Sequence, residues 1–279
     1  MLAALAFLTP LPVGAGRRPT GRTLLWFPLV GALLGGVLGM VWRLLDRVTL
    51  GQGLLVGILL VAADLALTGA LHFDGLVDTA DGLFAPVDGA RAAPQSGEHG
   101  AQTAPPGGEY GDPAAQEQGS GRTPGGERRV RRLAIMSGPE VGAFGLATGV
   151  LALLLRVACI AQLPSPRPLL LIGLWCASRT VMACVAAALP YARLEGGLAS
   201  AFLEGMPEAL IIGVPGVLLA VAAAAGDGIR GPLAVMAGLV AALGVALFAR
   251  RRIGGFTGDV LGACGFVCET VGLLVAAAR

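Results

Sequence analysis

Runs of about 20 apolar residues recur along this chain, and they constrain its fold more than any other feature. A helix of about 20 residues crosses the roughly 30 Å hydrocarbon core of a bilayer. Only 14% of the residues are charged, whereas soluble domains carry about 25%. The sequence therefore predicts an all-α, polytopic integral membrane bundle of about seven transmembrane helices, with six to eight as the range. The expected spans are about 24–45, 50–72, 141–163, 169–190, 209–226, 232–249 and 258–278.

The spans group into one membrane domain with a polar interruption. Residues 1–87 hold an N-terminal segment, the first two spans and an acidic motif, and 128–279 hold the remaining spans of the same domain. The first 13 residues are apolar but too short to cross, which favours an interfacial or re-entrant segment. Residues 88–127 are rich in Gly, Pro, Ala and Gln. Such a composition cannot bury a core, so this segment is expected to be a disordered cytoplasmic loop.

The arginines indicate an orientation. If the loops alternate across the membrane, one side receives 13 arginines, the other receives 5, and Arg156 and Arg179 lie within spans. Because cytoplasmic loops are enriched in basic residues, the amino terminus and the acidic motif are expected on the cytoplasmic side. The net charge is only +2 and the arginines form no single basic face, which argues against a nucleic-acid partner.

The acidic motif is the sequence T-G-A-L-H-F-D-G-L-V-D-T-A-D-G-L-F at 68–84. In a helix, Asp74, Asp78 and Asp81 share one face, where like charges repel. A divalent cation would relieve this repulsion, and carboxylates without neighbouring cysteine favour Mg²⁺. We therefore expect Asp74, Asp78 and Asp81 to be metal ligands. His72 could contact a phosphate, bind metal or transfer a proton, or it could be a structural histidine at the membrane boundary.

Further candidates lie near the same expected face. Asp259 follows Thr257 at a helix start, where it could help to hold an anion or simply cap the helix. Tyr191 and Arg193 lie in a polar loop that could grip a substrate. Within the spans, Asp64 and Glu269 are functional candidates because intramembrane carboxylates are costly; Asp64 could instead pair with Arg179.

With these residues in view, the chain resembles the adenosylcobinamide-GDP ribazoletransferase family, also called cobalamin (5′-phosphate) synthase. The matching sequences run in order along nearly the whole chain: W-F-P-L-V-G at 26–31, T-G-A-L-H-F-D-G-L-V-D-T-A-D-G at 68–82, G-A-F-G at 142–145, Y-A-R at 191–193, and T-G-D-V-L-G-A at 257–263 with the later Glu269. Two departures stand out. Residues 88–127 look like an insertion, and Ser137–Glu140 replaces a basic residue and an aspartate, with Glu140 as a substitute candidate.

The resemblance implies a Mg²⁺-dependent transferase of the bacterial inner membrane that completes the nucleotide loop of a cobalamin. Its substrates would be adenosylcobinamide-GDP and α-ribazole or its 5′-phosphate, and GMP would leave. On this hypothesis Asp74, Asp78, Asp81 and His72 are catalytic, with Asp81 as the first candidate base. Tyr191, Arg193, Thr257, Asp259 and Glu269 would bind substrate, and the arginines at 128–132 would also offset phosphate charge.

Two other functions use similar features. CDP-alcohol phosphatidyltransferases also carry spaced aspartates on membrane helices, but the sequence after Asp81-Gly82 lacks the Ala-Arg pair typical of them. A transporter could use Asp64, Arg179 and Glu269 as an ion path, but transporter sites usually lie near the midplane. The glycine-rich spans are as compatible with a homo-oligomer as with a monomer in the lipid bilayer.

Overall fold

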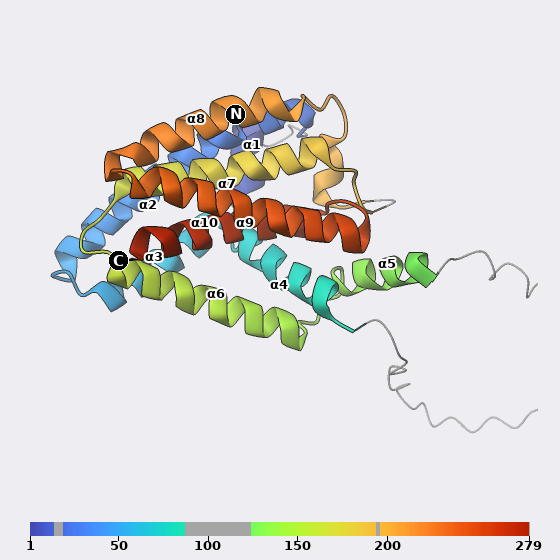
Figure 1. The fold of residues 1–279 in the computed structure, drawn as a ribbon, viewed down its shortest axis with the longest axis horizontal. Helices are drawn as coiled ribbons and strands as arrows, with labels where there is room; N and C mark the ends of the chain where they lie inside the picture. The colour runs from blue at the N-terminus through green and yellow to red at the C-terminus, as the bar shows by residue number, and fades with distance from the viewer. Residues whose placement is uncertain (14–18, 87–123, 194–195, 279) are drawn as a thin grey trace, which may run out of the picture.

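The protein is described by a computed structural model that covers residues 1–13, 19–86, 124–193 and 196–278. It is a bundle of helices whose long members run along one common direction (Figure 1). The elements are α1 Leu2–Leu8, η1 Gly21–Trp26, α2 Phe27–Val48, α3 Gly53–Thr68, α4 Leu71–Phe84, α5 Pro124–Ile135, α6 Ala143–Gln162, α7 Pro168–Ala188, η4 Leu198–Phe202, α8 Ala209–Ala224, η5 Ala225–Asp227, α9 Arg230–Ile253 and α10 Gly258–Ala277.

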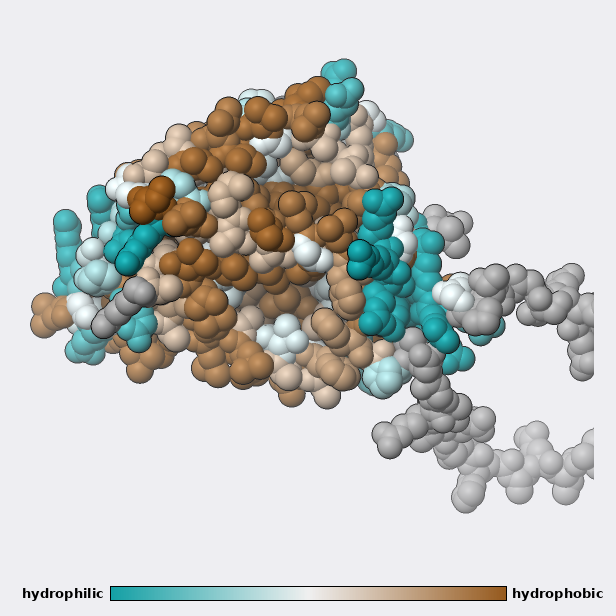
Figure 2. All heavy atoms as spheres, in the orientation of Figure 1, coloured by the Kyte–Doolittle hydropathy of each residue, from teal (hydrophilic) through white to brown (hydrophobic). Residues whose placement is uncertain are grey.

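The all-helical membrane fold is confirmed. Among the described residues, six helices are long and apolar enough to cross a bilayer, and the bent pair α3 and α4 makes a seventh crossing if it counts as one span. Apolar side chains cover the middle of the face seen in Figure 2, and polar side chains gather at its two ends. Leu151 and Leu210 are among the exposed apolar side chains on the bundle surface. This distribution is typical of a protein whose middle contacts lipid.

The core forms around α7 and α10. In the apolar stretch of α7, 83% of the residues are buried, against 22% in α8, so α7 is central and α8 is peripheral. α2 packs closely on α7, because Gly35 lies directly against the Leu171 carbonyl and a side chain there would clash. Small residues at such contacts let membrane helices approach without a hydrophobic driving force. Buried side chains from both sides of the 87–123 segment join this core.

The segment between α4 and α6 differs from expectation at one end. Residues 88–123 of the expected disordered loop lie outside the described residues. Residues 124–127 are helical, because α5 begins at Pro124. α5 lies beside the C-terminal end of α4, at the same end of the bundle as the end of α9 (Figure 1). Two of its arginines bond to other segments, as described below, and these contacts stabilise a helix that its own composition does not predict.

Candidate active site at the junction of α4 and α10

The acidic motif forms a helix of its own. The expected span at 50–72 extends too far. α3 ends at Thr68, and the chain then bends by 91° into α4. Gly69 and Ala70 make this turn with φ of 58° and 56°, a left-handed conformation that a residue with a side chain rarely adopts. Helical geometry in α4 then places Asp74, Asp78 and Asp81 on one face, as the spacing predicts.

α4 and α10 touch backbone to backbone. A Cβ atom added to Gly75 would lie 2.7 Å from the Asp259 carbonyl oxygen and 3.2 Å from the Gly262 Cα. Only glycine permits this approach. It sets Asp74, which is exposed, beside Asp259 at the start of α10. Two carboxylates that are distant in sequence thus meet at one position.

The loop after α7 completes this junction. The Ala192 amide donates to the Phe256 carbonyl at 2.8 Å, and the Phe256 amide donates to the Pro190 carbonyl at 3.0 Å. This pairing brings Arg193 to Asp259, with 2.8 Å between guanidinium Nη2 and carboxylate Oδ2. Thr257 Oγ1 accepts from the Val260 amide at 3.3 Å and so caps α10.

Tyr191 belongs to the same loop. Its hydroxyl donates to the Gly196 carbonyl at 2.8 Å, and its ring lies 5.4 Å from that of Phe256. Burial raises the pKa of Tyr191, while nearby Arg193 lowers it and Asp259 raises it. The phenol therefore stays protonated at neutral pH and serves as a hydrogen-bond donor.

These groups line a cavity of about 220 Å³, which we call the α4–α10 cavity. Its polar lining is His72, Asp74, Tyr191, Arg193 and Asp259, and its apolar lining is Phe7, Leu71, Met182 and Leu261. His72 is only 3% exposed. Neither of its ring nitrogens has a hydrogen-bond partner among the described residues. The structure thus brings together five of the side chains that the sequence singles out.

The three aspartates of α4 do not converge on one point. Asp78 is half-buried and interacts electrostatically with Asp74, Asp259, Asp81 and Arg193. Asp81 is buried, and its two oxygens accept from the Gly142 and Gly145 amides at 2.7 and 2.8 Å. It therefore binds the N-terminus of α6 and lines a different cavity, with Glu140. No three His, Cys, Asp or Glu side chains of the described residues meet closely enough to hold a metal ion.

Two carboxylates remain as candidates for holding Mg²⁺. Asp74 and Asp259 face the same cavity, and Asp78 lies beside them in electrostatic range. Mg²⁺ in phosphate-transferring sites is commonly held by one or two carboxylates, with water and substrate phosphates supplying the other ligands. The donor set thus fits Mg²⁺ with Asp259 in the place expected for Asp81. The Mg²⁺ requirement itself stays a prediction.

Two arginines of α5 have structural partners instead of facing the cavity. Arg132 is buried, and its Nη1 donates to the carbonyls of Gly82 and Leu83 at 2.8 and 2.6 Å. It thereby satisfies carbonyl groups at the end of α4. Arg129 donates to the Ala192 carbonyl at 2.9 Å, next to Arg193. Of the expected phosphate-binding arginines, only Arg193 lines the α4–α10 cavity.

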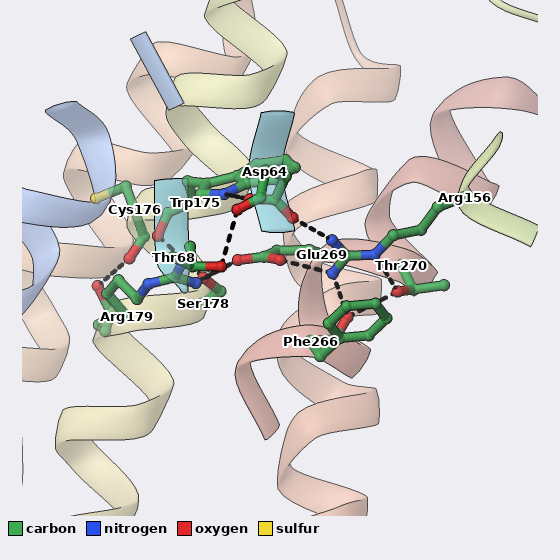
Figure 3. A network of polar contacts seen from close by, with 11 residues as sticks. Asp64, Thr68, Arg156, Trp175, Cys176, Ser178, Arg179, Phe266, Glu269 and Thr270 are labelled. Atoms are coloured by element: carbon green, nitrogen blue, oxygen red, sulfur yellow. Dashed lines mark hydrogen bonds and ion pairs between the residues drawn. The ribbon is translucent and has the colours of Figure 1, made fainter. Parts of the chain in front are cut away.

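A second group of charged side chains is sealed inside the bundle (Figure 3). We call it the buried ion network. Arg156 of α6 donates to Asp64 at 2.7 Å and to Glu269 at 2.6 Å, and Arg179 of α7 also pairs with Glu269. The Trp175 indole donates to Asp64 at 3.0 Å, and Arg156 donates to Thr270 at 2.8 Å. Two cations and two carboxylates thus tie α3, α6, α7 and α10 together.

The buried ion network corrects two expectations. The pairing of Asp64 with Arg179 was wrong, because the ionic partner of Asp64 is Arg156. Glu269 is 1% exposed and does not line the α4–α10 cavity, so the structure does not bring it to the expected substrate site. Sequence reasoning left Arg156 without a role, although a lone arginine within a span is a signal for a buried partner. It missed Phe7 altogether, and no sequence pattern marks this residue.

The comparisons with known proteins are consistent with this arrangement. A family model described as Cobalamin-5-phosphate synthase matches residues 1–94 and 121–277. The unmatched residues between these ranges lie inside the segment that the sequence predicts to be an insertion. No solved structure matches the chain.

Curated relatives match along almost their whole length, and all three described here are named adenosylcobinamide-GDP ribazoletransferase. The protein of Pseudomonas paraeruginosa is 36% identical over 94% of this chain and 91% of its own. That of Syntrophobacter fumaroxidans is 35% identical over 99% and 96%. That of Chlorobaculum parvum is 32% identical over 99% and 94%.

Proposed function

The chain belongs to the cobalamin-5-phosphate synthase family, and from that premise we propose that it joins α-ribazole, or its 5′-phosphate, to adenosylcobinamide-GDP. The product is adenosylcobalamin or its 5′-phosphate, and GMP is released. The observation that carries this proposal beyond the family is the α4–α10 cavity, where carboxylates and Arg193 meet beside a histidine that has no hydrogen-bond partner among the described residues. A CDP-alcohol phosphatidyltransferase and a transporter have no comparable support.

The reaction requires that the negative charge of a pyrophosphate be offset. A ribazole hydroxyl oxygen attacks the phosphorus that bears the cobinamide, the hydroxyl proton passes to solvent, and the bond from that phosphorus to the bridging oxygen breaks, so that GMP leaves with this oxygen. Mg²⁺, when bound, supplies positive charge for the pyrophosphate oxygens and the leaving phosphate. Asp74 and Asp259 would hold this ion, and Asp78 would add negative charge beside it.

The other side chains position the substrates. Arg193 is anchored by Asp259 and can donate to a phosphate oxygen with guanidinium nitrogens that this contact leaves over. The loop pairing with Phe256 fixes the backbone that carries Arg193, so little freedom is lost when a phosphate binds. Asp81 would act indirectly by fixing α6 against α4.

The arrangement also supports a direction in the membrane. The ends of α4 and α9, the start of α10 and all of α5 lie at one end of the bundle (Figure 1). This is the side to which the sequence assigns 13 arginines. The positive-inside rule then favours a cytoplasmic position for this end in the bacterial inner membrane.

The experiment follows GMP release from adenosylcobinamide-GDP and α-ribazole by membranes that contain the protein, with and without Mg²⁺. We expect GMP and a cobalamin in equal amounts, and no GMP after the metal is chelated. Asp78→Asn should abolish turnover without loss of membrane insertion. No GMP from a well-inserted protein would exclude the proposed reaction, and full activity with chelator would exclude the metal.

A further inference from the structure

His72 is buried in a position where its polar atoms have no partner within the described protein. The residue is 3% exposed, and its Nδ1 and Nε2 lack hydrogen-bond partners. A neutral imidazole carries one donor and one acceptor, and leaving both unmet is costly. Because His72 lines the α4–α10 cavity, a ligand in that cavity can satisfy it.

The rest of the cavity wall is largely apolar. Phe7, Leu71, Met182 and Leu261 line it together with the polar groups at the α4–α10 junction. Phe7 continues an aromatic cluster, since its ring centroid lies 4.7 Å from that of Phe202 and 5.9 Å from that of Phe27. An apolar wall with a few placed polar groups is the usual form of a site for a small, largely apolar molecule.

The size and the polarity of the cavity together select among the parts of the two substrates. Its volume of about 220 Å³ is below the roughly 300–1,000 Å³ of typical small-molecule sites. A corrin ring with its side chains cannot enter such a space, but the guanine base of the donor and the benzimidazole base of the acceptor are similar in size. The apolar wall favours the benzimidazole, which lacks the carbonyl and amino groups of guanine.

We propose that the α4–α10 cavity binds the acceptor nucleoside, with its aromatic base against Phe7 and Met182 and a ribose hydroxyl bonded to His72. This inference rests on the proposed function, since it assigns one of the two substrates to the cavity. It places the attacking hydroxyl next to Asp74 and Asp259, where the pyrophosphate of the donor must lie.

The kinetic test varies both substrates for His72→Ala and Phe7→Leu in membranes. Each variant should raise the KM for α-ribazole about tenfold or more, and leave the KM for adenosylcobinamide-GDP within about twofold. His72→Gln, which keeps a donor and an acceptor, should recover part of the loss. Phe248→Ala, which removes an aromatic ring of α9 outside the cavity, is the matched control. An unchanged KM for α-ribazole, or a rise in the KM for the donor instead, would overturn the proposal.

A binding test separates this proposal from the proposed function. Gly258 lines the cavity, and a Cβ there would meet no atom nearer than the Ala199 Cβ at 3.9 Å, so a side chain can begin at this position without a clash at its first atom. The detergent-purified wild type should bind α-ribazole alone, and Gly258→Leu should bind it at least about tenfold more weakly with an unchanged melting temperature. If the wild type releases no GMP, the proposed reaction fails, yet loss of binding in Gly258→Leu would still support the cavity. Equal binding by both proteins would refute it.

Discussion

The buried ion network and the α4–α10 cavity both gather charged side chains from distant helices, but their charges are satisfied to different degrees. In the network, Arg156 and Arg179 balance Asp64 and Glu269, and each carboxylate accepts hydrogen bonds from neighbouring helices, while Nε and Nη2 of Arg179 have no hydrogen-bond partner among the described residues. In the cavity, Arg193 is the one arginine beside two carboxylates, Asp74 and Asp259, and His72 has no hydrogen-bond partner in the part of the chain that the structure describes.

This difference separates a structural role from a binding role. Intramembrane charge invites a functional interpretation, yet a sealed set whose carboxylates are all paired with cations leaves no carboxylate for a ligand. A set with more carboxylates than cations on the wall of a cavity can still bind one. The balance of charge and the access to a cavity therefore distinguish the two regions better than the presence of charge. The following predictions test this distinction, from the largest expected effect to the smallest.

Arg156→Leu should have the largest effect, and on stability. It leaves Asp64 without an ionic partner and Glu269 with one cation fewer, in the buried interior of the bundle. Removing one member of a buried ion pair costs about 3–5 kcal/mol. We expect little folded protein in membranes and a sharply lower melting temperature in detergent. Arg43→Leu, at an exposed position of α2, is the control. A melting temperature equal to the wild type would show that the network is dispensable.

Asp74→Asn should leave stability unchanged and remove activity. Asp74 is exposed, so its charge is not needed for packing. Loss of a metal ligand should cost several kcal/mol of transition-state stabilisation, which corresponds to about 100-fold or more in kcat. GMP release should also lose its response to added Mg²⁺. The matched control is Asp46→Asn, on α2 and outside the cavity. A melting temperature well below that of the wild type would show instead that Asp74 has a structural role.

Asp81→Asn should have an intermediate effect that falls mainly on stability. The asparagine side chain has one oxygen, so one of the Gly142 and Gly145 amides loses its acceptor. An unsatisfied buried donor costs about 1–3 kcal/mol. We expect faster hydrogen exchange at the start of α6, a lower melting temperature and more residual activity than in Asp74→Asn. Complete loss of turnover at an unchanged melting temperature would show that Asp81 takes a direct part in the reaction.

Thr257→Ala should have the smallest effect. It removes the side-chain cap of α10, which typically costs about 1 kcal/mol. The rate of GMP release should fall only slightly, through a small displacement of the start of α10. Thr257→Ser keeps the hydroxyl and should resemble the wild type in both melting temperature and rate. A large loss of activity in the alanine variant alone, at normal stability, would indicate that the hydroxyl contacts substrate.

Much of the fold was accessible from the sequence because span length and hydropathy have one physical cause, the thickness of the hydrocarbon core. The shared face of Asp74, Asp78 and Asp81 followed from helical geometry. The turn at Gly69 and Ala70 did not, because small apolar residues there are equally compatible with a continuing helix. The partner of Asp64 also could not be derived, since it depends on which helices become neighbours.

The side chains of the α4–α10 cavity show the same limit of prediction from sequence. Asp259 and Arg193 were candidates one by one, but their meeting depends on Gly75 and on the backbone pairing at Phe256. Asp81 looked equivalent to Asp74 because both belong to one periodic pattern. Its binding to the amides of α6 depends on where α6 lies, which periodicity along α4 does not contain.

The contacts of Arg132 indicate where the chain could be divided into two polypeptides. By donating to the carbonyls of Gly82 and Leu83, it fastens the start of the second part of the chain to the end of the first. α6 adds a further tie through Asp81. The covalent link between α4 and α5 is thus duplicated by non-covalent contacts. Residues 1–86 and 124–279, produced as two separate polypeptides, should find each other in the membrane, and the join is a natural position for a split reporter.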